Sequence, residues 1–75
     1  MTQEKIIIKY LEAHYPNWIP GFRFHGLDTE WGFIGSRGER TLREMREDGI
    51  VERQLNEKGF AIYRVKKERG QANLF

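Results

Sequence analysis

The chain has 75 residues, of which 39% are hydrophobic and 13% aromatic, and its formal net charge is +2. This length allows one small domain, and the apolar content is too high for a disordered chain. Cysteine is absent, which excludes disulfides and thiolate metal sites. There are two histidines, and no metal or cofactor is expected. No apolar run approaches the roughly 20 residues that span a bilayer, and no secretory leader is recognisable, so a cytoplasmic protein without a membrane partner is expected.

Residues 3–14 are predicted to form the first helix. Their apolar side chains recur at helical spacing on one side, whereas most of the charged side chains fall on the other. The residues on the apolar side are Ile6, Ile7, Tyr10, Leu11 and His14. Thr2 is a candidate N-cap, and Pro16 and Pro20 are expected to end the helix and to impose an extended or turning path.

Residues 15–35 combine large aromatic side chains with glycines. The alternation in Phe22–Phe24 predicts a short strand. The stretch Asp28–Trp31 predicts the start of a short helix capped by Asp28, because Gly32 argues against a long one. Aromatic residues in so short a chain are expected to form the core, and the alternative is that exposed ones stack on bases. The large aromatic residues of this segment are Trp18, Phe22, Phe24, Trp31 and Phe33.

Residues 36–48 carry the clearest helix signal. Ser36 followed by Glu39 fits a capping box, and Gly49 occupies the position of a left-handed C-cap. The other face is charged, and residues 37–48 hold four basic and four acidic side chains. The two apolar positions that would dock this helix on the core are Leu42 and Met45.

Residues 50–66 are predicted to form a β-hairpin. Its arms are residues 50–55 and 60–65, and the polar turn between them ends in Gly59. Alternation in the second arm places Phe60, Ile62 and Arg64 on one face and Ala61, Tyr63 and Val65 on the other. Residues 49–75 carry six basic and three acidic side chains, so the positive surplus lies in the C-terminal third.

The segment from Ser36 to Val51 resembles the recognition helix and the start of the wing in bacterial and phage winged helix-turn-helix DNA-binding proteins. Those proteins often combine a serine start, an arginine-rich helix with two apolar positions three apart, and a glycine followed by two aliphatic residues. The resemblance covers residues 36–65 well and the first helix loosely, and the middle segment departs from it because the usual second helix is rich in alanine and leucine. It implies an α+β winged-helix domain over residues 1–66, with a helical core and a C-terminal β-hairpin wing.

In such a protein the recognition helix enters the major groove of double-stranded DNA with its N-terminal residues facing the base edges. The resemblance therefore implies DNA contacts by the helix residues Arg37, Arg40, Thr41 and Arg43. On the hairpin, phosphate contacts are expected from Arg53, Lys58 and Arg64. The alternative is an ordinary exposed helix with the i,i+4 ion pairs Arg40–Glu44 and Arg43–Glu47, whose acidic residues would repel phosphate.

The last five residues, QANLF, resemble the sliding-clamp-binding pentapeptide of bacterial replication and repair proteins. Its pattern is glutamine, two variable positions, leucine and phenylalanine. The resemblance implies that Gln71 hydrogen-bonds at the mouth of a clamp pocket that Leu74 and Phe75 fill. Residues 67–75 would then be a flexible tail, and Ala72 departs from the leucine common at its position. The alternative is that Leu74 and Phe75 pack back on the domain.

These features predict a small non-enzymatic replication or repair adaptor or regulator, of bacterial or phage origin, that binds double-stranded DNA and a sliding clamp. With DNA binding, it would be associated with the nucleoid. No nucleophile beside a base and no phosphate loop is evident, so no catalytic residue is expected. The alternatives are a transcription regulator that binds DNA as a homodimer, a winged-helix protein-interaction module that does not touch DNA, and an RNA-binding domain.

Overall fold

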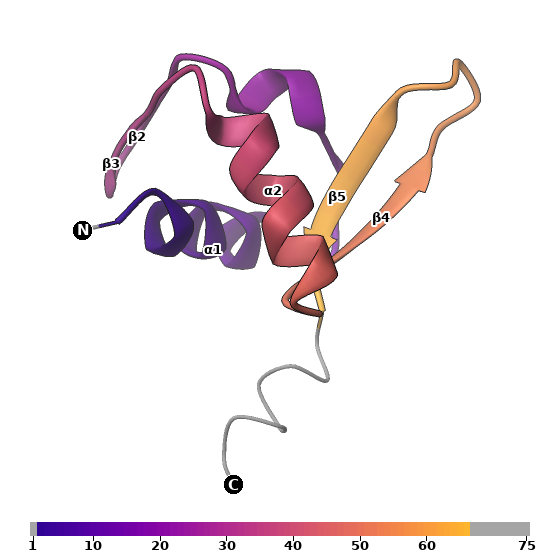
Figure 1. Cartoon of the computed structure of the whole chain (residues 1–75), viewed down its shortest axis with the longest axis horizontal. Helices are drawn as coiled ribbons and strands as arrows, with labels where there is room; N and C mark the ends of the chain where they lie inside the picture. The colour runs from indigo at the N-terminus through magenta and orange to yellow at the C-terminus, as the bar shows by residue number, and fades with distance from the viewer. Residues whose placement is uncertain (1, 67–75) are drawn as a thin grey trace, which may run out of the picture.

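The computed structural model describes residues 2–66, which form two α-helices, a short 3₁₀ helix and two antiparallel sheets (Figure 1). The predicted α+β class is confirmed. In chain order the elements are α1 (Gln3–His14), β1 (Ile19–Pro20), η1 (Gly21–Phe24), β2 (Leu27–Thr29), β3 (Gly32–Ile34), α2 (Gly38–Glu47), β4 (Val51–Leu55) and β5 (Ala61–Val65). The predicted tail, residues 67–75, lies outside the described residues.

Helix α1 has the predicted bounds and the predicted cap. The side-chain oxygen of Thr2 accepts a hydrogen bond from the Lys5 N–H at 3.3 Å, which satisfies one of the free donors of the first turn. The apolar side of the helix is buried, except that His14, which shares its spacing, is exposed. Its imidazole lies at the edge of the core in the last turn and packs on the Tyr10 ring at 4.3 Å.

The segment between the helices differs from the prediction in two places. Phe22–Phe24 is not a strand but part of η1, which begins directly after Pro20, whose φ is −60°. Asp28 does not cap a helix, because it lies in β2 of the β2–β3 hairpin. The Thr29 hydroxyl closes the turn of this hairpin by accepting from the Trp31 N–H at 3.1 Å and donating to the Gly32 carbonyl at 2.6 Å. These bonds favour a tight turn over a helical start.

Strand β5 is the centre of the main sheet, whose order is β1-β5-β4 with both pairings antiparallel. The predicted C-terminal hairpin is confirmed, with each arm one residue shorter at its start. Register pairs Val51 with Val65 and Arg53 with Tyr63, so the predicted division of the second arm into two faces is also confirmed. The inner face packs on the helices.

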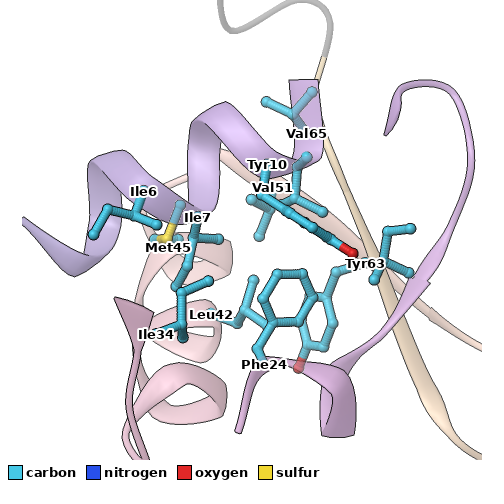
Figure 2. Close-up of a cluster of buried hydrophobic side chains, with 12 residues drawn as sticks. Ile6, Ile7, Tyr10, Phe24, Ile34, Leu42, Met45, Val51, Tyr63 and Val65 are labelled. Atoms are coloured by element: carbon cyan, nitrogen blue, oxygen red, sulfur yellow. The ribbon is translucent and has the colours of Figure 1, made fainter. Parts of the chain in front are cut away.

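The core lies between α1, α2, η1, β3 and the inner face of the main sheet. Figure 2 shows side chains from these elements meeting in one cluster. The predicted docking residues Leu42 and Met45 are fully buried. Burying one such side chain stabilises the fold by about 1.5–3 kcal/mol. The largest fully buried side chains are those of Phe24, Ile7, Leu11, Ile34, Leu42, Met45 and Val51.

The β2–β3 hairpin is tied to α1 by the amide of Gln3. Its Nε2 donates to the Phe33 carbonyl at 2.8 Å, and its Oε1 accepts from the Gly35 N–H at 3.2 Å. One side chain therefore satisfies two backbone groups at the end of β3. This contact fixes the chain on its way into α2.

The order of elements and the pairing of β1 with the C-terminal hairpin are compatible with a winged-helix layout. Between β1 and α2, however, residues 21–34 hold η1 and a hairpin where a helix-turn-helix protein has an α-helix. Glycines and alternating aromatics there lack helical periodicity. Within the described residues, neither helix is long and apolar enough to cross a bilayer.

Candidate nucleic-acid interface

The start of α2 is fixed by a backbone contact with η1. Gly38 is the first residue of the helix, and a Cβ at this position would overlap the carbonyl oxygen of Phe24. The Gly38 N–H donates to the Gly35 carbonyl at 3.3 Å. Because this turn begins the helix, the predicted capping box at Ser36 is wrong. The N-cap residue is Arg37, and no side chain makes a cap hydrogen bond there.

At its other end, α2 terminates as predicted. Gly49 has φ +77°, and its N–H donates to the Arg46 carbonyl at 3.0 Å. The Ile50 N–H donates to the Met45 carbonyl at 2.9 Å. This pair of bonds is a Schellman motif, which turns the chain directly into β4.

The exposed face of α2 carries opposite charges at its two ends. Arg37 and Arg40 lie at the N-terminal end with one carboxylate, Glu39, between them, and Arg43 lies just past the middle of the helix. The C-terminal end has the reverse balance, and its exposed charged residues are Glu44, Arg46, Glu47 and Asp48. The helix dipole favours acidic side chains at the start and basic ones at the end, so this distribution does not serve helix stability. The start of α2 is therefore the more positive end of the helix.

Few contacts within the domain engage these arginines. Arg40 and Glu44 are paired at 4.0 Å, but their side chains are 67% and 66% exposed, and such a surface pair contributes little. The predicted pair of Arg43 with Glu47 does not form within the described residues. Thr41 differs from the arginines, because it is half-buried and its hydroxyl donates to the Arg37 carbonyl at 3.1 Å.

The hairpin of β4 and β5 ends in a turn held by one asparagine. The Asn56 side-chain oxygen accepts hydrogen bonds from the backbone N–H groups of Lys58 and Phe60, both at 2.9 Å. Gly59 has φ +85°, the conformation that this turn requires of its last residue. Lys58 at the tip and Arg53 in β4 are both exposed, as contacts with phosphates require.

Arg64 is engaged within the domain. Its Nε donates to the Glu52 carboxylate at 2.8 Å, and its guanidinium lies 4.4 Å from the centre of the Trp18 ring. Nη1 also donates to the Pro16 carbonyl at 3.4 Å. The side chain links β5 to β4 and to the segment before β1. We therefore do not retain the predicted phosphate contact by Arg64.

Arg23 is a candidate that the sequence reasoning missed. It is exposed in η1, between Phe22 and the buried Phe24, whose carbonyl packs against the first residue of α2. This contact places η1, the element that carries Arg23, beside the start of α2. The signal available in the sequence was a lone basic residue in an otherwise aromatic and glycine-rich segment.

The candidate interface is defined by Arg23, Arg37, Arg40, Arg43, Arg53 and Lys58. In Figure 1 the start of α2, η1 and the tip of the β4–β5 hairpin all point toward the same end of the molecule, opposite the end where α2 finishes. The fold thus brings the predicted residues of the helix and the hairpin tip to one end.

A hollow of about 420 Å³ lies between the last turns of α1 and the β2–β3 hairpin. It is lined by Tyr10, Ala13, His14, Asp28, Thr29, Glu30 and Trp31. No group of three or more histidine and carboxylate side chains in residues 2–66 could hold a metal ion. Comparisons with protein-family models, with curated proteins and with solved structures found no match for this chain.

Proposed function

We propose that residues 2–66 form a winged-helix domain that binds double-stranded DNA. The observation that carries this proposal is the concentration of arginines at the exposed start of α2, against the preference of the helix dipole. In the bound state the first turns of α2 lie in the major groove. There the guanidinium groups of Arg37 and Arg40 pair with guanine edges or with phosphates.

The β4–β5 hairpin acts as the wing in this proposal. Arg53 and Lys58 contact phosphates, which position the domain on the duplex without reading sequence. Arg23 adds a third phosphate contact beside α2. The acidic side chains at the end of α2 point away from the DNA, because only the start of the helix enters the groove.

The second proposed partner is a bacterial-type sliding clamp, which the C-terminal residues bind. Support comes from the sequence alone, because Gln71, Leu74 and Phe75 lie outside the described residues. A clamp encircles DNA. Because the domain and the peptide belong to one chain, binding of either one raises the effective concentration of the other at its own target. The protein is then a non-enzymatic adaptor or regulator where clamp and DNA coincide.

Duplex binding is tested by fluorescence anisotropy with a blunt duplex over a range of salt concentrations. With about five phosphate contacts, the logarithm of the affinity falls with the logarithm of the salt concentration with a slope of about −4 to −5. Arg40→Glu is expected to weaken binding by at least about tenfold. The matched control is Arg46→Glu, which makes the same charge change at the opposite end of α2 and should cost less than about threefold.

Equal effects of the two charge reversals would refute docking through the start of α2. Absence of duplex binding even at low salt would leave the protein-interaction module as the better assignment.

Clamp binding is tested with the full chain and a purified bacterial sliding clamp. Leu74→Ala combined with Phe75→Ala should abolish the interaction, whereas Asn73→Ala, at a variable position of the pattern, should preserve it. Melting temperature is measured in parallel. A peptide ligand leaves it unchanged, and a large fall without any clamp binding in the parent protein would instead assign these residues to packing on the domain.

A further inference from the structure

Two phenyl rings lie exposed side by side at the tip of the β4–β5 hairpin. Phe22 of η1 is 58% exposed and Phe60 is 48% exposed, and their ring centres are 5.6 Å apart with an angle of 74° between the planes. Burying a phenylalanine stabilises a fold by about 1.5–3 kcal/mol, so leaving two of them half-exposed forgoes much of that gain. An edge-to-face pair also leaves a ring face open to a third flat group.

The tip that carries Phe60 is closed by four hydrogen bonds. Besides the two bonds to the Asn56 side chain, the Asn56 N–H donates to the Phe60 carbonyl and the Gly59 N–H donates to the Asn56 carbonyl, both at 2.9 Å. Phe22 braces the ring from η1. A ligand that stacks on this pair therefore meets a surface that needs little ordering on binding.

A hollow of about 400 Å³ opens beside the rings. Its lining residues are Pro20, Phe22, Asn56, Glu57, Lys58 and Phe60. Both backbone bonds of the Asn56 side chain go to its oxygen, and the amide nitrogen has no acceptor within residues 2–66, so its two N–H groups are free to donate. Lys58, an exposed basic residue, is part of the lining, and Arg23 follows Phe22 directly in the chain.

We infer that this hollow takes an unpaired nucleobase. The base stacks on the phenyl pair, an acceptor on its edge takes a hydrogen bond from the Asn56 amide, and Lys58 contacts the adjoining phosphate. The inference rests on the proposed function, which puts the hairpin tip against the DNA backbone. It narrows the DNA substrate to a duplex with unpaired nucleotides beside it, such as a single-stranded tail, gap or fork.

The test compares a blunt duplex with the same duplex carrying a short single-stranded tail. Wild-type protein should bind the tailed duplex at least about fivefold more tightly, the factor that corresponds to the weakest base–aromatic stack. Phe22→Leu combined with Phe60→Leu keeps apolar bulk but removes the flat faces, and should reduce the preference to none. Phe33→Leu, at an aromatic residue 57% exposed on β3, is the matched control and should retain it.

A second measurement uses wild-type protein alone and so does not depend on the folding of a variant. The fluorescent base 2-aminopurine, placed at the first unpaired position, should be quenched on binding because it stacks on an aromatic ring. Unchanged emission, equal affinity for the two duplexes, or a preference that survives in the double variant each overturns the inference.

The two proposals fail separately. The proposed function stands without the base site if binding of the blunt duplex depends on salt, is lost in Arg40→Glu and is not improved by a single-stranded tail. Binding of tailed or single-stranded DNA without binding of the blunt duplex retains the base site and removes docking of α2 in a major groove.

Discussion

The contact between Gly38 and the Phe24 carbonyl makes the sharpest prediction about the fold. In Gly38→Ala the new methyl group would overlap that carbonyl oxygen, and it would lie 2.7 Å from Cγ2 of Ile34. The oxygen belongs to the backbone of η1 and cannot move aside by a change of rotamer. Either η1 or the start of α2 must shift, although the core around Phe24 and Ile34 is fully buried.

The magnitude follows from the two opposing effects of the substitution. Forcing an extra methyl group into a packed core costs about 1–3 kcal/mol, and a contact with backbone belongs at the upper end of that range. Replacing glycine by alanine in a helix returns about 0.5–1 kcal/mol. The expected net loss is about 2 kcal/mol, which corresponds to a fall in melting temperature of about 8–16 °C for a domain of this size.

Thermal and urea unfolding followed by circular dichroism measure this loss. Gly35→Ala is the matched control, because no atom lies within 4 Å of its new Cβ and its φ is not in the left-handed region. The free energy of unfolding of that variant should lie within about 0.5 kcal/mol of the parent's or slightly above it. A Gly38→Ala protein that is as stable as the Gly35→Ala protein would refute the close approach of η1 to α2.

Substitutions at three further positions test the contacts that position the interface. Gln3→Ala removes both hydrogen bonds to the end of β3 and should cost about 1–2 kcal/mol in urea unfolding, and an unchanged midpoint would show that this tie carries no stability. Gly49→Ala should lower the free energy of unfolding by about 1–2 kcal/mol, because residue 49 has a φ of +77°. Gly49→Asn should lower it clearly less, since asparagine tolerates this conformation, and equal losses would contradict the left-handed cap. Arg64→Lys keeps the charge but loses the planar contact with Trp18 and should lower stability by about 1 kcal/mol while the salt dependence of DNA binding stays the same. Arg64→Gln removes the charge as well, and a salt slope smaller by about one in that variant would return Arg64 to the phosphate contacts.

The charge balance of α2 has a consequence for how the protein meets a duplex. Averaged over residues 37–48 the helix is neutral, which on its own argues against a nucleic-acid partner. The charges are, however, separated along the helix axis. The electrostatic potential at one end of a helix is set by the nearest charged groups and not by the net charge of the whole helix, so the start of α2 can still attract an anion. A domain of this kind is expected to bind with α2 pointing at the DNA and not lying flat along the groove.

The sequence by itself determined those elements whose signals are local. Helix α1 follows from its apolar spacing and the Thr2 cap, the end of α2 follows from Gly49, and the hairpin turn follows from residues 56–59. Each of these features depends on backbone hydrogen bonds between residues only a few positions apart. The same holds for the faces of β5, because alternation along a strand is a property of the strand alone.

Tertiary structure decided everything that depends on residues distant in the chain. A strand at Phe22–Phe24 was a reasonable local prediction, but packing against α2 selected a 3₁₀ turn instead. The helix predicted at Asp28 failed for a local reason, because the hydroxyl of Thr29 closes the turn of a hairpin. The start of α2 moved past Ser36 because Gly38 alone can approach the η1 carbonyl. Arg64, one of seven residues predicted to contact DNA, is held by a carboxylate and an indole ring that periodicity along β5 cannot reveal. Exposure of individual aromatic side chains also depends on the whole fold, which is why Phe24 is in the core while Phe22, two residues earlier, faces solvent beside Phe60.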